Sequence, residues 1–343
     1  MTLLIFLSRY SVKLLVLAVC FSINVVFSAE ISDYQLCVLQ KTQVSDANKT
    51  AVDIVAECKI VNPDKSETKT AIKKYSVIEE RLKIDKSNEF KPYTLMAHKP
   101  NYIIPIAYNS SGYDSSAYQQ LPGSQNIVFD DIEAQFQISI KTPLAVDLFN
   151  KDISVYTGYT NRSFWQVYNS KISSPFRETN HEPEVWLQTT SSTSFMGFDN
   201  RINILGISHQ SNGRSNALSR SWNRIYAKFA FEKESFVFGI KLWNRFNESS
   251  EFDDNPDITE YMGHGEFRVI YKKDRQTFNF MSRNNIESGF ERGATELSWS
   301  FPIGKRKDLR GYIQFFSGYG ESLIDYNQSV NRIGFGISLS DWL

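Results

Sequence analysis

A histidine, a serine and an asparagine lie close together in two neighbouring segments whose residue pattern is that of β-strands. His209 and Ser211 are two residues apart in the first segment, and Asn223 lies in the second. Side chains two apart in a strand point to the same side, so the imidazole and the hydroxyl share one face. A serine hydroxyl becomes a nucleophile when a base removes its proton, and that base needs a third group to fix its tautomer. These residue types therefore suit acyl transfer, with serine as nucleophile, histidine as base and asparagine as orienter.

The strand face that carries the three residues is otherwise apolar. Leu205 and Ile207 precede His209 on this face, and Ile225 follows Asn223. Polar groups on a lipid-facing surface cost free energy and are usually functional. An asparagine can orient the histidine without placing a further charge beside lipid. A His-x-Ser pair also recurs by chance, so spacing alone leaves two unrelated surface residues as an alternative.

Alternation of apolar and polar residues continues through most of the chain from about residue 90. For example, Ile132, Ala134 and Phe136 alternate with Glu133 and Gln135. The segments run to about ten residues, which is the length that a tilted strand needs to cross a bilayer. A soluble β-sandwich is the alternative, but polar faces with charges of both signs suit the interior of a barrel. The pattern predicts an all-β fold, a twelve-stranded antiparallel transmembrane β-barrel. The predicted strands lie near residues 93–108, 127–142, 151–166, 183–195, 201–211, 220–232, 235–246, 258–272, 274–284, 292–302, 308–319 and 331–341.

The N-terminus has the layout of a secretory signal peptide. Arg9 and Lys13 precede the apolar run 14–27, and small and then polar residues follow. The run is short for a transmembrane helix, so we predict a cleaved signal peptide over residues 1–29. Cys20 follows a Leu-Ala-Val sequence that faintly resembles a lipoprotein site, but the valine and the apolar residues after the cysteine argue against lipidation.

Residues 30–87 are rich in Lys, Glu, Asp and Ser and differ from the alternating remainder. We predict a small N-terminal periplasmic extension here, followed by a transmembrane barrel domain over residues 88–343. Cys37 and Cys58 are the two cysteines left after signal cleavage. An oxidising periplasm would allow them to form a disulfide, and two free thiols are the alternative.

Charge and composition exclude two classes of protein. The chain of 343 residues holds 38 Lys and Arg against 38 Asp and Glu, so no excess of positive charge points to a nucleic acid partner. After the N-terminal run, no apolar stretch is long enough for a membrane helix. The 25 Phe and 17 Tyr, together with even charge, fit an outer-membrane barrel whose polar interior dilutes the hydropathy signal.

The segment between the two strands, 210–216, combines polar residues with Gly213. The backbone N–H of this glycine is well placed to donate to an oxyanion next to Ser211. Ser219 and Asp254, with main-chain carbonyls, offer hard oxygen ligands of the kind that calcium takes. The chain has no EF-hand loop, and an ordinary polar extracellular loop is the simpler interpretation of these residues on their own.

Five stretches of the chain resemble the outer-membrane phospholipase A family. They are SSPFRETNHEP at 173–183, HQSNGRS at 209–215, SRSWNR at 219–224, DNPDIT at 254–259 and SGYGESLIDYN at 317–327. These motifs are long enough to be specific, and they occur in order between about residue 88 and the C-terminus. None of the five stretches lies in the predicted periplasmic extension.

The resemblance implies a twelve-stranded barrel whose active site lies outside the barrel, at the outer-leaflet edge of the bacterial outer membrane. It implies that Ser211 is the nucleophile, His209 the general base and Asn223 the orienter, and that Gly213 supplies the oxyanion N–H. The implied activity is hydrolysis of acyl esters of membrane phospholipids to a lysophospholipid and a fatty acid.

The resemblance also implies calcium (Ca2+) beside the oxyanion hole. The Arg214 carbonyl, Ser219 and Asp254 would hold the ion, with Ser173 donated by a second subunit. Activity in this family appears on calcium-dependent homodimerisation, so the monomer would be dormant.

Two positions depart from the family pattern. Gln210 and Asn216 occupy positions where family members often carry Asp. These differences leave the trio intact and bear on the strength of calcium binding.

His181 and His264 have no partner visible in the sequence. Because His264 shares the charged face of its segment with Glu266, a hydrogen bond in the lumen is the simpler role for it than metal binding.

A non-enzymatic barrel, either a channel or a structural outer-membrane protein, is the rival hypothesis. A channel needs its special residues inside, whereas His209, Ser211 and Asn223 are predicted to face lipid. The predicted lumen side chains carry both signs of charge, which favours a plugged interior over an open pore. They are Arg224, Lys228, Lys241, Glu266 and Arg268.

Overall fold

The structure is a computed structural model that describes residues 76–340 except 93, 174, 252, 286–287 and 307–308. The described residues belong to one compact unit, Tyr75–Leu343. The predicted signal peptide with Cys20 and the predicted disulfide lie outside the described residues.

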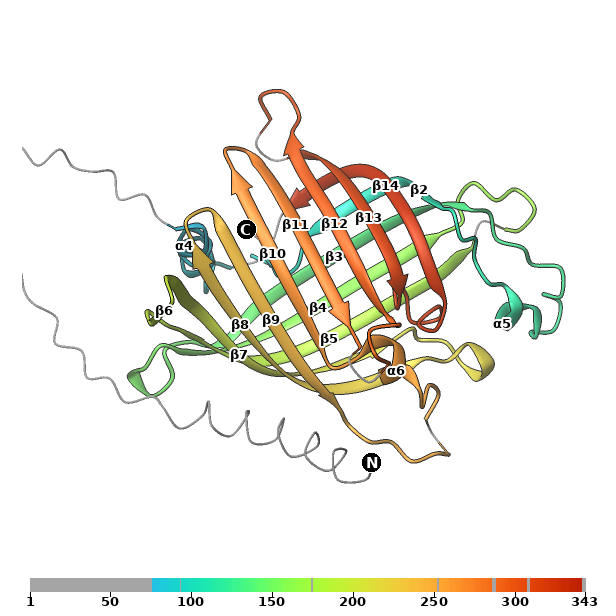
Figure 1. Ribbon diagram of the computed structural model, residues 1–343, viewed down its shortest axis with the longest axis horizontal. Coiled ribbons are helices and arrows are strands. Elements are labelled where there is room, and N and C mark those ends of the chain that lie inside the picture. The colour runs from blue at the N-terminus through green and yellow to red at the C-terminus, as the bar shows by residue number, and fades with distance from the viewer. Residues whose placement is uncertain are drawn as a thin grey trace, which may run out of the picture. The chain divides into compact units, whose positions relative to one another are not determined.

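Twelve long antiparallel strands form a closed barrel (Figure 1). Each long strand pairs with the next one along the chain, and the last pairs with the first to close the cylinder. They are β2 (Asn101–Asn109), β3 (Ile132–Ala145), β4 (Ile153–Trp165), β5 (Phe176–Thr190), β7 (Phe198–Ser211), β8 (Ser221–Lys233), β9 (Phe236–Arg245), β10 (Gly265–Lys273), β11 (Gln276–Asn284), β12 (Gly293–Pro302), β13 (Arg310–Tyr319) and β14 (Ser329–Ser340). Two strands of two residues, β1 (Met96–Ala97) and β6 (Ser194–Phe195), add to β3 and β7. The predicted twelve-stranded antiparallel barrel is confirmed.

The described helices are short, and one of them corrects a predicted strand. The sequence predicts a single strand over 258–272, whereas the chain first forms a helix and enters β10 at Gly265. Ile258 and Met262 are four residues apart and both buried, so helical spacing places them on one inner face. No helix among the described residues is long and apolar enough to cross a membrane. The helices are α4 (Val77–Asn88), α5 (Ser116–Gln119) and α6 (Ile258–Met262), with 3-10 turns η2 (Leu148–Asn150) and η3 (Asn216–Leu218).

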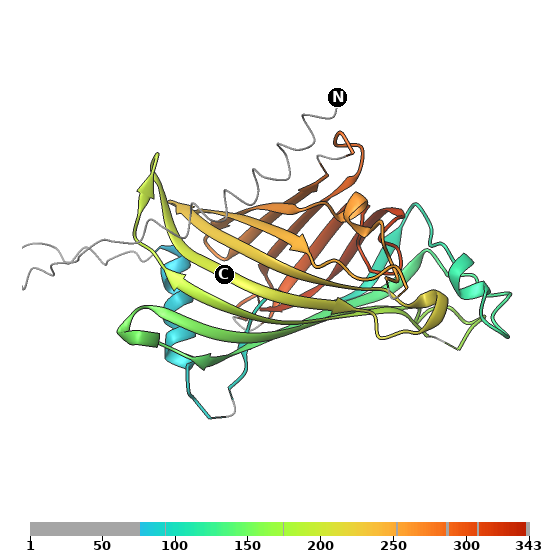
Figure 2. The same cartoon turned by 90° about the horizontal axis from the view of Figure 1, so that it is seen from below.

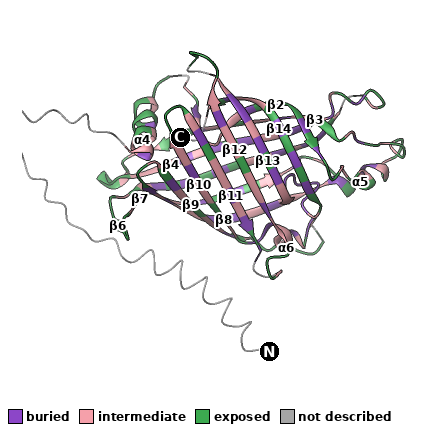
Figure 3. Cartoon of the chain, turned by 45° about the horizontal axis from the view of Figure 1, so that its top comes forward, coloured by how far each residue is buried: buried purple, intermediate pink, exposed green. Residues whose placement is uncertain are grey.

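Successive residues of each strand face opposite sides of the barrel wall, so burial alternates along the strands (Figure 3). In β7, Leu205 and Ile207 are 41% and 53% exposed, whereas Gly206 and Ser208 are buried. Large apolar side chains recur on the exposed face of most strands, which makes the outside suitable for contact with lipid hydrocarbon. Examples are Ile103, Ile138, Val185, Ile225, Phe267, Leu297 and Ile333.

The interior holds a cluster of aromatic and aliphatic side chains instead of an open channel. The inward-facing rings come from β4, β5, β8 and β9, and α6 and the segment before β14 add further apolar groups. This packing fills part of the lumen and stabilises the barrel from inside. The cluster comprises Met96, Tyr156, Trp186, Trp222, Tyr226, Trp243, Ile258, Met262, Leu323 and Tyr326.

The two ends of the barrel differ in the length of their connections. Short turns at 234–235 and 274–275 join strands at one end, and long loops such as 110–131, 212–220 and 320–328 join them at the other. Outer-membrane barrels have short periplasmic turns and long extracellular loops. Helix α4 lies at the short-turn end and α5 at the opposite end (Figure 2). The long-loop end is therefore the extracellular end.

A row of stacked aromatic rings marks the short-turn end of β9 to β12. Phe236 lies 4.6 Å from Tyr271, and Phe278 lies 5.7 Å from Trp299, between ring centroids. Trp299 also contacts Phe301, with centroids 4.6 Å apart and the two rings tilted by 42°. Aromatic belts of this kind lie at the membrane–water interface, so the row locates the periplasmic edge of the bilayer.

Helix α4 packs against the inner wall at the short-turn end. A capping box between Ser76 and Glu79 begins the helix. The fully buried Ile78 joins an apolar cluster with residues of β7 to β10, and its N–H donates to Glu232 at 3.2 Å. Further along, Asp85 pairs with Lys141 of β3 at 2.6 Å. The last part of the predicted periplasmic extension thus belongs to the barrel unit, and the division of the chain at residue 87 stays a prediction.

Candidate active site

The β7–β8 hairpin places His209, Ser211 and Asn223 on the outer wall of the barrel. The strand register pairs His209 directly with Asn223, and Ser211 with Ser221. His209 is exposed and the other two residues of the trio are half-buried, in line with the exposed Ile207 on the same face. The trio stands at the end of β7 that leads into a long loop, which is the outer-leaflet side of the membrane.

The predicted base and the predicted orienter are in contact. Nδ1 of His209 lies 2.9 Å from Oδ1 of Asn223. A carbonyl oxygen only accepts, so this contact places the ring proton on Nδ1 and leaves Nε2 as an acceptor. Ser211 follows on the same face about 7 Å along the strand. Among the described residues no hydrogen bond joins the Ser211 hydroxyl to the imidazole, and such contacts commonly tighten only when substrate binds.

Asn212 shapes the loop between the two strands, residues 212–220. Its backbone N–H donates to the Arg220 carbonyl at 3.0 Å, and its side-chain Oδ1 accepts from the Arg220 N–H at 3.0 Å. Gly213 follows with φ of +62°, a left-handed conformation that glycine adopts without strain. In the part of the chain that the structure describes, the Gly213 N–H has no hydrogen-bond partner. This donor is therefore available to an oxyanion formed next to Ser211.

Two of the four predicted metal residues are in direct contact. The Ser219 hydroxyl donates to Oδ2 of Asp254 at 2.5 Å, although the two residues come from different loops. Hydroxyl and carboxylate oxygens are ligands that calcium prefers. Within the described ranges, no three His, Cys, Asp or Glu side chains gather as a metal site. A metal at this point would therefore depend on hydroxyl, carbonyl and water oxygens as well as on Asp254.

The side chains of the other two predicted metal residues make no described contact with this pair. The Arg214 guanidinium donates to the carbonyls of Phe176 and Arg177 at 2.8 and 2.9 Å, which ties the loop to the start of β5. Ser173 is exposed in the loop between β4 and β5, where a second subunit could reach it. None of the contacts described for Ser173 joins it to Ser219.

The two departures from the family pattern differ in their surroundings. Gln210 faces the interior, where its Oε1 accepts from Trp222 at 2.9 Å and from Arg224 at 3.1 Å. Asn216 lies in η3, and its carbonyl accepts from the Ser219 N–H at 3.0 Å. Of the two, only Asn216 adjoins the Ser219–Asp254 pair, so Gln210 has no direct bearing on a metal there.

A second histidine adjoins the trio, although no partner for it is visible in the sequence. His181 of β5 lies directly opposite Ser211. Its Nδ1 accepts from the Tyr159 hydroxyl at 2.6 Å and from the Asn161 amide at 3.4 Å, so the ring proton sits on Nε2. A Cβ at Gly213 would lie 3.7 Å from this Nε2. The pairing of β5 with β7 brings His181 next to Ser211. There, its Nε2–H is a hydrogen-bond donor close to Gly213.

A contact between two extracellular loops holds the acidic loop in place. The Tyr326 hydroxyl donates to Asp257, and the Arg220 guanidinium lies 5.9 Å from the Tyr326 ring centroid. Burial and the hydrogen bond to Asp257 raise the pKa of Tyr326, so it stays a neutral donor. Because Asp254 and Asp257 belong to one loop, this contact supports the position of Asp254 beside Ser219.

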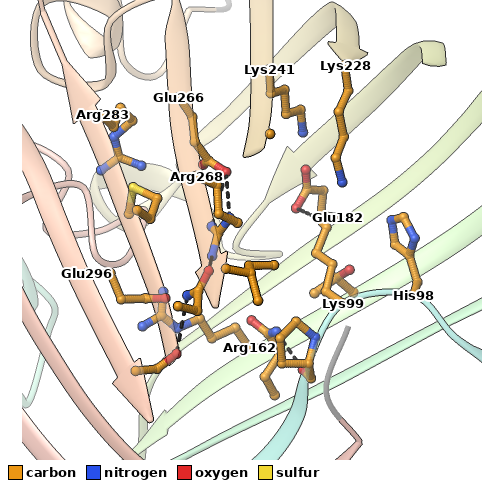
Figure 4. A pocket seen from close by; sticks show the side chains of 18 of the residues that line it. His98, Lys99, Arg162, Glu182, Lys228, Lys241, Glu266, Arg268, Arg283 and Glu296 are labelled. Carbon is orange, nitrogen blue, oxygen red and sulfur yellow. Dashed lines mark hydrogen bonds and ion pairs between the residues drawn. The ribbon is translucent and has the colours of Figure 1, made fainter. Parts of the chain in front are cut away.

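The barrel interior holds a cavity of about 290 Å³ lined by charged side chains (Figure 4). Arg224 pairs with Glu182 at 3.0 Å, and Arg268 pairs with Glu266 at 3.0 Å. The first pair joins β8 to β5 and the second lies within β10, so the charged side chains of the lumen neutralise one another beside the aromatic cluster. The arrangement is that of a plugged barrel, whereas porins keep an aqueous channel.

Comparison with known proteins identifies the family. The model of the family described as phospholipase A1 matches residues 78–339. The chain belongs to the phospholipase A1 family. A relative from Neisseria meningitidis serogroup B is 39% identical over 256 residues, which are 71% of this chain and 65% of the relative, so the chain spans just under two thirds of that protein. The phospholipase A1 of Escherichia coli K12 is 37% identical over 250 residues, 73% of this chain and 83% of the relative.

Two solved structures of the phospholipase family resemble the barrel. The Salmonella typhi outer membrane phospholipase, a dimer with bound calcium, matches with a TM-score of 0.70 and 35% identity over 76% of this chain and 97% of that one. Outer membrane phospholipase A of Escherichia coli, with an asparagine-to-alanine substitution in its active site, matches with a TM-score of 0.69 and 35% identity over 76% and 98%. Family and fold together make the chain an outer-membrane phospholipase. The predicted family, enzyme class and location are confirmed, and the roles of individual site residues stay predictions.

Proposed function

We propose that this outer-membrane phospholipase is a calcium-dependent esterase in which Ser211, His209 and Asn223 carry out the chemistry, and that it acts as a homodimer. The observation that carries the proposal is the 2.9 Å contact between the imidazole of His209 and the amide of Asn223 on the lipid-facing wall. A polar pair at that position is costly beside hydrocarbon, and it leaves Nε2 of the imidazole ready to accept a proton.

In the proposed reaction, the Ser211 Oγ attacks the acyl carbonyl carbon of a phospholipid while its proton passes to Nε2 of His209. The tetrahedral intermediate collapses, the ester C–O bond breaks, and His209 returns the proton to the departing lysophospholipid oxygen. Water, with its proton taken by His209, then attacks the acyl-serine ester. Collapse releases a fatty acid and restores the Ser211 hydroxyl. Asn223 keeps the ring proton on Nδ1 throughout.

The backbone N–H of Gly213 would stabilise the oxyanion in both halves of the reaction. It lies two residues after Ser211, and it has no partner among the described residues. A preorganised donor of this kind lowers the activation free energy by roughly 3 kcal/mol, because it does not need to rearrange as negative charge develops on the oxygen.

Calcium fits the oxygen ligands predicted to lie next to this oxyanion-binding N–H. The Ser219 hydroxyl and the Asp254 carboxylate would hold it, and the Arg214 carbonyl, water and Ser173 of the partner subunit would complete the set. When bound, calcium supplies positive charge beside the oxyanion hole. The related Salmonella typhi structure, a dimer with bound calcium, supports both the ion and the assembly.

The outer wall around the trio offers an apolar surface to a second copy. Val185 and Leu187 of β5 and Leu205 and Ile207 of β7 are each at least 40% exposed. Two such surfaces facing one another would form grooves in which the acyl chains of a phospholipid stay out of water. The acyl ester groups of the phospholipid would then lie near His209 and Ser211, on the outer-leaflet side of the membrane.

The experiment that tests the proposal is fatty acid release from phospholipid by the purified full chain in detergent, with calcium and with a chelator. Release with calcium, its loss with chelator and its loss in Ser211→Ala are expected. Circular dichroism should show that the variant keeps its barrel. Hydrolysis at the wild-type rate by Ser211→Ala would refute the nucleophile, and equal rates with calcium and chelator would refute the role of calcium.

A further inference from the structure

We propose that Glu248 is a positioning residue for this hydrolysis, and the inference rests on the proposed function above. Oε1 of Glu248 accepts a hydrogen bond from Nδ2 of Asn223 at 3.2 Å. The same amide presents its Oδ1 to His209 at 2.9 Å. A chain of contacts thus runs from a carboxylate through the amide to the imidazole, with each end of the amide holding a different partner.

Strand pairing brings Glu248 to this position. β8 and β9 pair with Arg224 opposite Arg245, and the ladder continues one residue further because the Phe246 N–H donates to the Asn223 carbonyl at 2.9 Å. Glu248 follows two residues later and is half-buried. The contact therefore depends on the backbone register beside Asn223, and the carboxylate is held more firmly than one on a free surface loop.

The carboxylate of Glu248 selects one of the two orientations of the Asn223 amide. An ionised carboxylate can only accept hydrogen bonds, so it binds the NH2 end of the amide and turns the oxygen toward His209. The oxygen in turn accepts only from an N–H, which keeps the ring proton on Nδ1. Nε2 then remains unprotonated on the side of the ring that Ser211 requires.

The reverse orientation of the amide would disable the base. With its NH2 end toward His209, Asn223 would donate to Nδ1, and the ring proton would move to Nε2. An imidazole in that tautomer cannot accept the proton of Ser211. Asparagine alone does not discriminate between the two orientations, because both ends of its amide form hydrogen bonds, so a second group must decide.

Other carboxylates of the same loop have different surroundings and provide a control. Asp253 pairs with Arg245 at 2.5 Å, and Asp254 accepts from Ser219. Glu251 is exposed, has the same charge as Glu248 and is three residues away. A variant at Glu251 therefore removes the same net charge from the loop without changing the environment of Asn223.

The test compares kcat and KM of the full chain in detergent with calcium for the wild type, Glu248→Ala and Glu251→Ala. Glu248→Ala should lower kcat about tenfold with little change in KM, because one charge-assisted hydrogen bond that acts on the base is lost. Glu251→Ala should match the wild type. The ¹⁵N chemical shifts of His209 should show Nε2 gaining a proton in Glu248→Ala, which a purely structural role would not produce.

A double variant separates this role from a general effect of the loop. If Glu248 acts through the amide, Glu248→Ala should cause no further loss in an Asn223→Ala background. An equal tenfold loss in both backgrounds, or a wild-type kcat for Glu248→Ala, would overturn the inference. Absence of hydrolysis by the wild-type protein would instead refute the proposed function itself, so the two failures are distinguishable.

Discussion

His209 and Asn223 face each other across the β7–β8 ladder, with the imidazole Nδ1 2.9 Å from the amide Oδ1 on the outside of the barrel. Residues directly opposite in an antiparallel pair have Cβ atoms about 5 Å apart, so the backbone register alone brings the two side chains within reach. The pairing explains how a wall in contact with lipid can hold these two polar side chains in fixed geometry.

Removal of the Asn223 amide should slow catalysis without unfolding the barrel. We expect Asn223→Ala to lower kcat about 30-fold, equivalent to about 2 kcal/mol, because the ring proton of His209 loses its acceptor. Steady-state hydrolysis of a phospholipid in detergent measures the change. Asn244→Ala is the matched control, since Asn244 is exposed on the neighbouring strand and its side-chain amide donates to the adjacent Arg245 carbonyl. A wild-type kcat for Asn223→Ala would contradict the orienting role.

Asp254 should determine how much calcium the enzyme needs. Asp254→Ala removes the carboxylate next to Ser219, so the calcium concentration for half-maximal activity should rise about tenfold or more. Activity measured in a calcium titration gives this value, and Glu251→Ala in the same loop should leave it unchanged. An unaltered calcium requirement in Asp254→Ala would exclude this carboxylate from the metal site.

The ion pair between Asp85 and Lys141 should stabilise the closed periplasmic end. Both side chains are 7% exposed, so Asp85→Ala would leave a buried ammonium without its carboxylate. We expect this variant to lose about 3 kcal/mol of unfolding free energy, measured by denaturant titration in detergent. Replacing both residues, with Asp85→Ala and Lys141→Met, should recover part of that loss. A double variant as unstable as the single one would contradict the pairing.

The plugged lumen predicts that the barrel conducts ions poorly. Ion pairs such as Arg224–Glu182 lie in the interior, and the cavity of about 290 Å³ is lined mainly by charged and polar side chains next to the aromatic cluster. Planar-bilayer recordings of the purified protein should therefore show no large, steady, ion-selective openings. Openings of that kind would favour the rival interpretation of the chain as a channel.

The alternation of apolar and polar residues was sufficient to predict the barrel and the outward direction of the trio. Burial follows the predicted period along β7, where Leu205 and Ile207 are exposed and Ser208 is buried. Alternation failed at residues 258–262 because one short helical turn buries Ile258 and Met262 at helical spacing. A window of five residues is too short to separate the two periods.

Contacts between distant segments were not accessible from the sequence. His181 lies opposite Ser211 only because β5 pairs with β7 in one particular register. Glu248 reaches Asn223 because the β8–β9 ladder extends beyond Arg245. His181 falls within a family-like stretch, but the sequence shows no partner for it, and the residues around Glu248 show no pattern that marks a site. The register of each strand pair depends on the whole barrel. The residues that contact the trio can therefore be identified only from the structure.

Whether Ser211 is the nucleophile is tested most directly by covalent trapping. A long-chain alkylsulfonyl fluoride sulfonylates an activated serine hydroxyl, and mass spectrometry of the digested protein locates the label. With calcium present, we predict one label per chain on Ser211, loss of hydrolysis in proportion to labelling, and no reaction of Ser211→Ala. Labelling at another serine with the same loss of activity, or full hydrolysis by Ser211→Ala, would contradict the assignment.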